Sequence, residues 1–245
     1  MNDHELAAAL AEEAGRLLLG VRQELADAEA EERKNQGDKR SHDYLMAALA
    51  AARPDDAVLS EEGADDPVRL SAERVWIVDP LDGTREFSEP GRQDWAVHVA
   101  LWSRGELAAG AVALPAQGVT LATPAVPNPP AWPDAPRVVV SRTRPPAVAQ
   151  RVREHLDGTL VELGSAGAKV AAVVQGQAEV YVHAGGQYEW DSAAPVAVAR
   201  AAGLHTSRID GSPLIYNQPD PLLPDLLVCP KSLVDEVLEA LHSGD

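Results

Sequence analysis

The chain has 245 residues, a length that fits one large α/β domain or two small lobes that share a core. Its formal net charge is −17, from 38 acidic and 21 basic residues. A field of this sign repels nucleic-acid backbones and anionic lipids, so we expect neither a nucleic-acid polymer nor a membrane as a partner. Cys229 is the only cysteine, which excludes an internal disulfide and a zinc site built from cysteines.

The start of the chain and its hydropathy predict a soluble cytoplasmic protein. The first residues, MNDHELAAAL, lack the basic and apolar regions of a secretory signal. No apolar run approaches the roughly 20 residues that cross a bilayer. Because the overall field repels anions, a site for a small phosphorylated substrate must be locally positive, through bound cations or a few arginines and lysines.

Helical periodicity dominates the N-terminal part of the chain. Apolar side chains recur at intervals of three and four from His4 to about Arg33, which predicts one amphipathic helix. The polar stretch KNQGDKRS then predicts an interruption, and a second helix is expected to end near Arg53-Pro54.

Extended segments follow these helices. The first two run directly into acidic residues and the third has alternating side chains: Ala57–Leu59, Val75–Val78 and Trp95–Trp102. Gly105 and Gly110 are expected to separate further strands up to Thr123.

The segment PAVPNPPAWPDAP, residues 124–136, contains six prolines and predicts a connector without regular structure. It would join an N-terminal lobe, residues 1–123, to a C-terminal α/β lobe, residues 137–245, with one site between them. In the second lobe strands and helices are expected to alternate. The expected strands are Val138–Ser141, Leu160–Leu163, Val180–His183 and Leu226–Cys229. The expected helices lie near Val148–Leu156, Ala168–Gln175 and Asp191–Ala202, and a last helix extends to His242.

The loop Asp79-Pro80-Leu81-Asp82-Gly83 follows a hydrophobic strand and has two interpretations. Asp-Gly is a strong hairpin signal, yet Thr84-Arg85-Glu86-Phe87 is not an alternating return strand. Two carboxylates and a carbonyl are hard oxygen ligands of the kind that magnesium prefers. Gly83 permits close approach of a ligand, and a helix that starts at Thr84 would offer free N–H groups to a phosphate.

Two further acidic motifs favour the metal interpretation. They are Ser60-Glu61-Glu62 and Trp190-Asp191-Ser192-Ala193-Ala194. In this order and spacing, the three motifs resemble the magnesium-dependent, lithium-sensitive inositol monophosphatase superfamily over essentially the whole length. The resemblance implies the α+β layered sugar-phosphatase fold, with alternating α-β-α-β-α layers, and two or three Mg²⁺ ions per site.

The resemblance also implies roles for individual residues. The expected metal ligands are Glu61, Asp79, the Leu81 carbonyl, Asp82 and Asp191, with Asp79 bridging two ions. The expected catalytic residues, which act on an attacking water, are Asp38, Glu61 and Thr84. The expected substrate contacts are Glu61, Leu81, Asp82, Gly83, Thr84, Arg142, Lys169 and Asp191. His98 is expected to pack or to donate from behind the site, and His183 to lie near it without being a ligand.

Within the superfamily, three segments resemble the CysQ-type 3'(2'),5'-bisphosphate nucleotidases. They are Asp82–Phe87, Gly164–Lys169 and Ser141-Arg142. Lys169 would meet a second phosphate, although Ala166 replaces a serine of that branch and one extra residue precedes the lysine. Tyr216-Asn217 fits the same branch or a hairpin return.

The resemblance therefore predicts a phosphatase that converts 3'-phosphoadenosine 5'-phosphate to AMP and phosphate in sulfur assimilation, by two-metal activation of water. The alternatives are inositol-1-monophosphatase, fructose-1,6-bisphosphatase, or a non-catalytic sensor of nucleotide or metal. Whether the chain forms a homodimer is left open.

Overall fold

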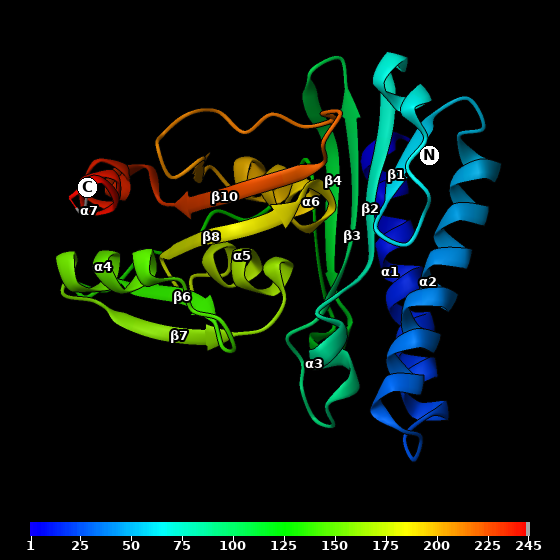
Figure 1. The fold of residues 1–245 in the computed structure, drawn as a ribbon, viewed down its shortest axis with the longest axis horizontal. Helices are drawn as coiled ribbons and strands as arrows, with labels where there is room; N and C mark the ends of the chain where they lie inside the picture. Colours follow the sequence, from blue (N-terminus) through cyan, green and yellow to red (C-terminus); the bar gives the residue numbers. More distant parts are fainter. Residues whose placement is uncertain (244–245) are drawn as a thin grey trace.

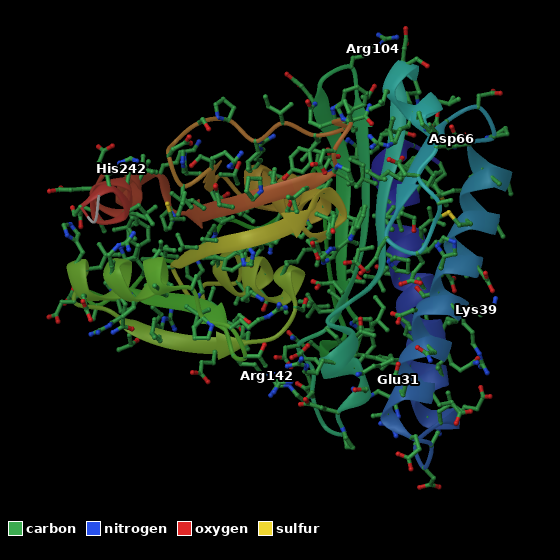
Figure 2. The ribbon with its side chains drawn as sticks, viewed as in Figure 1. Glu31, Lys39, Asp66, Arg104, Arg142 and His242 are labelled. Atoms are coloured by element: carbon green, nitrogen blue, oxygen red, sulfur yellow. The ribbon has the colours of Figure 1, made fainter. Side chains whose placement is uncertain are left out.

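The computed structural model describes residues 1–243 and consists of five layers, α-β-α-β-α (Figure 1). Helices α1 and α2 cover the outer face of the first sheet, helices α5 and α6 lie between the two sheets, and helices α4 and α7 cover the second sheet. The layered α/β fold expected from the sequence is confirmed. Long charged side chains such as Lys39, Asp66 and Arg104 lie at the surface (Figure 2).

The first sheet has the strand order β1-β2-β3-β4-β5. Its strands are β1 (Ala57–Ser60), β2 (Arg74–Asp82), β3 (Ala96–Ser103), β4 (Glu106–Leu114) and β5 (Val119–Ala122). Strands β1 and β2 are parallel and the other pairs are antiparallel. Gly110 lies inside β4 and separates no strands, contrary to expectation. A Cβ there would lie 2.6 Å from the Cβ of Ala197, so glycine lets α6 pack closely on this sheet.

The two N-terminal helices, α1 (Asp3–Glu24) and α2 (Ala30–Ala52), have boundaries different from those expected. The single helix expected from His4 to about Arg33 is wrong, because α1 ends at Glu24 and α2 begins at Ala30. The stretch KNQGDKRS lies inside α2 and does not interrupt it. The buried guanidinium of Arg33 donates to three carbonyl oxygens of the inter-helix turn, those of Leu25, Ala26 and Ala28. These bonds supply donors to carbonyls of the turn, and they hold the turn between the two helices in place.

The second sheet has the strand order β7-β6-β8-β10-β9. Its strands are β6 (Arg137–Ser141), β7 (Thr159–Leu163), β8 (Val180–Tyr188), β9 (His205–Ser207) and β10 (Leu222–Cys229). Its helices are α4 (Ala147–His155), α5 (Ala166–Val174), α6 (Glu189–Ala201) and α7 (Val234–His242). The predicted strands and helices of this region are all present, whereas β9 was not expected. Gly203, with a φ of +79°, directly follows the C-cap residue of α6.

The proline-rich segment 124–136 contains no helix or strand and joins β5 of the first sheet to β6 of the second. Helix α6 follows this segment in the sequence, yet it packs on strands β2, β3 and β4, which precede the segment. The division into lobes at this segment stays a prediction. Across residues 1–243, no helix has both the length and the apolar character required to cross a membrane.

Candidate metal centre and substrate cleft

Two carboxylates converge at the end of β2. In a regular strand, side chains three positions apart point to opposite faces. The register between β2 and β3 shifts between Asp79 and Asp82, so this alternation is broken. The Asp79 carboxylate accepts a hydrogen bond from the Leu81 N–H at 3.0 Å, which stabilises the turn. The loop Asp79–Gly83, called the metal loop below, is therefore the irregular end of a strand and not a hairpin.

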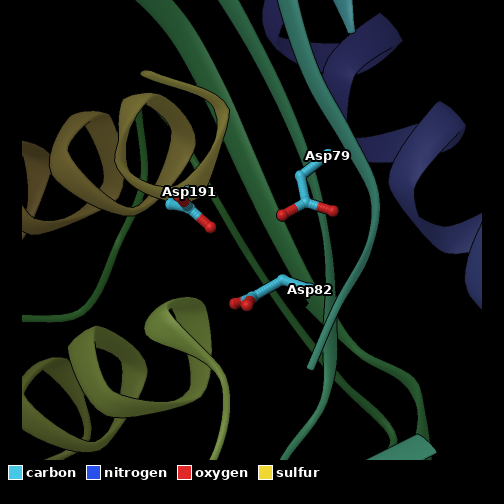
Figure 3. A group of neighbouring side chains, drawn as sticks. All are labelled: Asp79, Asp82 and Asp191. Carbon is cyan, nitrogen blue, oxygen red and sulfur yellow. The ribbon is translucent and has the colours of Figure 1, made fainter. Parts of the chain in front are cut away.

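Asp191, in the first turn of α6, supplies the third carboxylate. One oxygen from each of Asp79, Asp82 and Asp191 can be chosen so that all lie within 4.8 Å of one another (Figure 3). Asp191 accepts a hydrogen bond from the Tyr188 N–H at 2.6 Å, in a capping box that holds the carboxylate at the start of the helix.

Two further acidic residues lie in this region: Glu61 is close to the triad, and Asp38 is close to Glu61. Parallel pairing aligns Ser60 with Val78, so Glu61 follows β1 beside Asp79. Part of Glu61 is exposed, yet burial and neighbouring carboxylates raise its pKa to about 7. Asp38 lies on α2, and burial together with the charges of the Glu61–Glu62 pair raises its pKa to about 7.

The donor set fits a divalent cation. Burial and then the adjacent carboxylates raise the pKa of Asp79 well above its usual value, and burial and then Asp82 raise the pKa of Asp191 to about 6. Such crowding of anions is costly unless a cation compensates it. Carboxylate oxygens in this arrangement suit magnesium. The residues that could hold it are Glu61, Asp79, Asp82, Asp191 and, through its carbonyl, Leu81.

Asp82 differs from its neighbours because donors surround it. Its carboxylate accepts hydrogen bonds from the Ser165 hydroxyl, from the Ala166 N–H at 3.2 Å and from the Gly167 N–H at 2.6 Å, all at the N-terminus of α5. The His98 Nε2 lies 3.2 Å from the same group. Burial opposes ionisation of Asp82, but His98 and Ser165 outweigh it and lower the pKa to about 2.

Gly83 marks the transition from β2 to α3 (Thr84–Ser88). Its φ is +85°, and an added Cβ would lie 3.0 Å from the Cβ of Ser165 and 3.2 Å from the carbonyl oxygen of Asp94. Glycine is therefore required both by the backbone conformation and by the space. The Thr84 hydroxyl donates to the Leu81 carbonyl at 3.4 Å, so the loop folds back on itself beside the acidic triad.

A cleft of about 420 Å³ opens beside the triad. Its walls come from the metal loop with α3, from the loop after β6, from the start of α5 and from the His183–Gln187 segment of β8. Its charged lining residues are Asp82, Arg85, Glu86, Arg144, Lys169 and Asp191. Acidic and basic groups thus face one cavity.

Residues 2–126 and 135–244 match the model of the inositol monophosphatase family. The chain belongs to the inositol monophosphatase family. The resemblance inferred from three short motifs is confirmed at this level, and the match leaves out only part of the proline-rich segment in the interior of the chain.

Several curated members of the family are similar to this chain. The 3'-phosphoadenosine 5'-phosphate phosphatases of Mycobacterium tuberculosis and Mycobacterium bovis are 53% identical over 238 residues, covering 94% of this chain and 89% of each relative. The 3'(2'),5'-bisphosphate nucleotidase CysQ of Escherichia coli is 35% identical over 198 residues, covering 73% of this chain and 77% of that protein.

Solved structures of the family share the fold. CysQ from Bacteroides thetaiotaomicron superposes with a TM-score of 0.77 at 26% identity, covering 94% of this chain and 97% of that one. Inositol monophosphatase-II from Staphylococcus aureus superposes with a TM-score of 0.81, covering 98% of this chain and 96% of that one. At 20% identity the second comparison shows the fold alone.

Five of the ten site residues expected from the sequence line this cleft, whereas Asp38, Glu61, Asp79, Leu81 and Arg142 do not. Gly83, Thr84 and Lys169 line it together with two triad members. Arg142 does not line it, because its guanidinium donates to Glu86 at 2.7 Å and to Glu89 at 2.6 Å. A substrate contact by Arg142 stays a prediction, and these two ion pairs disfavour it.

The Tyr216-Asn217 motif lies behind the site. The Tyr216 hydroxyl is buried 3.2 Å from the Ser192 hydroxyl, below the first turn of α6. Asn217 has a left-handed φ of +59° and accepts a hydrogen bond from Arg69 at 2.8 Å. This pair therefore supports the base of α6 and does not return a hairpin.

Sequence reasoning missed the groups that hold the acidic side chains and the start of α6 in place. Ser165 and its neighbours at the start of α5 bind Asp82, and the buried Glu189 accepts the N–H groups of Asn217 and Gln218 at 2.6 and 2.7 Å. Arg69, which lies between β1 and β2, donates hydrogen bonds to the same segment. The position of Glu189, directly before Trp190-Asp191, was a usable signal.

Proposed function

We propose that the protein is a magnesium-dependent phosphatase that converts 3'-phosphoadenosine 5'-phosphate to AMP and phosphate, a step of sulfur assimilation. The observation that carries the proposal is one cleft that is lined both by Asp82 and Asp191 of the acidic triad and by several cations. The names of the 53% identical mycobacterial relatives support the same substrate. An acidic metal site suits the phosphate that is cleaved, and the cations suit a second phosphate.

The residues of the chain have distinct roles in this proposal. Magnesium, when bound, would polarise the phosphate and favour ionisation of water. Asp38, with a pKa of about 7, is suited to take a proton from the attacking water at neutral pH. The Thr84 hydroxyl, which donates to the Leu81 carbonyl, would orient that water. Glu61 would be one of the metal ligands. The N–H groups of Gly83 and Thr84, where β2 gives way to α3, would donate to the phosphate.

The test is a side-by-side assay of 3'-phosphoadenosine 5'-phosphate, inositol 1-phosphate and fructose 1,6-bisphosphate, with magnesium and with excess chelator. We expect the highest kcat/KM for the bisphosphate nucleotide, loss of turnover in chelator, and inhibition by lithium. Full activity in chelator would exclude the metal mechanism. Preference for another substrate would favour one of the alternative phosphatases, and magnesium binding without turnover would favour a sensor.

Two expectations from the sequence are independent of this assay. The cytoplasmic location and the homodimer stay predictions. Neither is required by the chemistry, because every proposed ligand comes from a single chain.

A further inference from the structure

Almost every cation of this acidic chain has a partner. Most of the 21 basic side chains form an ion pair with a carboxylate. Others donate to carbonyl or hydroxyl oxygens: Arg22, Arg33, Arg151, Lys169 and Arg200. Within residues 1–243, the side chains with neither kind of partner are Arg85, Arg144 and Lys231.

Two of these three unpartnered cations line the same cleft. Arg85 reaches it from α3 and Arg144 from the loop after β6, and both residues are exposed. Lys169 faces the same cleft from α5. It is only 5% exposed, and its ammonium donates to the Ser165 carbonyl at 2.7 Å, with no carboxylate within 4 Å in the described part of the chain. Lys231 lies in a different hollow, beside Pro230.

The neighbouring Arg142 shows that the pattern does not come from a shortage of acids. It precedes Arg144 by two positions and lies near α3 (Figure 2), but Glu86 of α3 and Glu89, which follows α3, form ion pairs with the two ends of its guanidinium. In a chain of net charge −17, an arginine that lacks a carboxylate leaves a favourable interaction unmade. Arg85 and Arg144 are therefore available to a ligand, whereas Arg142 is not.

We propose that Arg85 and Arg144, together with Lys169, bind the second phosphate of the substrate, the one that is not hydrolysed. This inference rests on the proposed function. A phosphate presents several acceptor oxygens, and the planar guanidinium fork of arginine matches them with paired hydrogen bonds. The arrangement separates two tasks, because the acidic residues would bind metal and the cations that line the same cleft would bind the anion.

The test compares two substrates that differ only in the second phosphate, 3'-phosphoadenosine 5'-phosphate and adenosine 3'-phosphate. The variants are Arg85→Gln, Arg144→Gln and the double variant, assayed with saturating magnesium. The control is Lys231→Gln, which removes an equally unpartnered charge outside the cleft. Within residues 1–243 none of the three side chains forms an ion pair or a hydrogen bond, so none of these changes removes such an interaction from the fold.

We expect each single variant to lose about tenfold in kcat/KM for the bisphosphate, chiefly through KM, as for a lost charge-assisted hydrogen bond. The ratio of kcat/KM between bisphosphate and monophosphate should fall by about a hundredfold in the double variant. Lys231→Gln should keep the ratio of the unmodified protein.

The outcomes separate this inference from the function on which it rests. If the unmodified protein hydrolyses the bisphosphate no better than adenosine 3'-phosphate, the proposed substrate is wrong. If it prefers the bisphosphate but the double variant keeps that preference, the assignment of Arg85 and Arg144 is overturned and the function stands. Equal losses on both substrates would also overturn the assignment, because they would place the arginines in the part of the site common to both.

Discussion

Asp79 and Asp82 are three positions apart and chemically similar, yet their surroundings give them opposite properties. Asp79 is buried among carboxylates and receives one backbone hydrogen bond, so its pKa is raised. Asp82 receives the Gly167 N–H and the Ser165 hydroxyl and faces His98, so its pKa is lowered to about 2 despite burial. The charge on Asp79 therefore needs a bound cation, whereas the charge on Asp82 is already stabilised by the protein.

This difference predicts different effects of the same substitution. Asp79→Asn should remove turnover but keep or increase the free energy of unfolding in chelator, because it removes repulsion and its side-chain oxygen still accepts the Leu81 N–H. Asp82→Asn should also remove turnover, and should lower the free energy of unfolding by about 1–3 kcal/mol, because an amide places donors against donors. Urea unfolding in chelator and initial rates in magnesium measure the two effects. Equal destabilisation by both substitutions would contradict this account.

Helix α2 contains a glycine that its propensity does not explain. Glycine inside a helix costs roughly 0.5–1 kcal/mol relative to alanine. At Gly37, however, a Cβ would lie 2.7 Å from the Phe87 Cε1 and 2.9 Å from the Leu81 Cδ2. The glycine lets α2 lie directly on the metal loop and on α3, which also brings Asp38 toward Glu61.

Gly20 offers a matched comparison, because nothing lies within 4 Å of an added Cβ at this position in α1. Gly20→Ala should raise the free energy of unfolding by about 0.5–1 kcal/mol. Gly37→Ala should lower it by about 1–3 kcal/mol, because overpacking outweighs helix propensity. It should also reduce kcat, because the metal loop must move. Chemical unfolding and rate measurements on both variants test this, and stabilisation by Gly37→Ala would show that the contact with the loop is not tight.

The whole molecule combines a net charge of −17 with carboxylates that hold protons at unusually high pH. Asp38 and Glu61 have pKa values raised to about 7, and Asp191 to about 6, in each case by burial first. In the unfolded chain these groups ionise near pH 4. Their contribution to stability is therefore fully present below about pH 4 and is lost as the pH rises through 6 to 7.

We accordingly expect the metal-free protein to become less stable between about pH 5 and about pH 8, by about 1–3 kcal/mol. His98, whose pKa is raised overall although burial opposes this, acts in the same direction, whereas burial lowers the pKa of His183 and His205, which act in the opposite one. If the carboxylates hold magnesium as proposed, magnesium should restore stability at the higher pH, because ligand binding to the native state adds to its stability. Urea unfolding at both pH values, in chelator and in magnesium, gives the result. A metal-free stability that rises with pH would contradict the proposed arrangement of carboxylates.

The sequence by itself determined the family, the acidic loop 79–83 and most strands and helices. Asp79, Asp82, Gly83 and Thr84 lie within one short loop, so their proximity needs no long-range contact. Glu61 could also be singled out from the sequence, because it directly follows a predicted strand and belongs to an acidic pair. Motifs of this kind can be read from local order because the chemistry constrains adjacent residues.

The tertiary structure decided which side chains face the cleft and what surrounds each ligand. Arg142 and Arg144 are indistinguishable by position, and only Glu86 and Glu89, more than fifty residues earlier, neutralise the first. The end of α1 depends in the same way on the buried Arg33, whose guanidinium satisfies the carbonyls of the turn. Such choices depend on the energies of contacts between distant segments, because a charge or a carbonyl finds its partner in space and not along the chain.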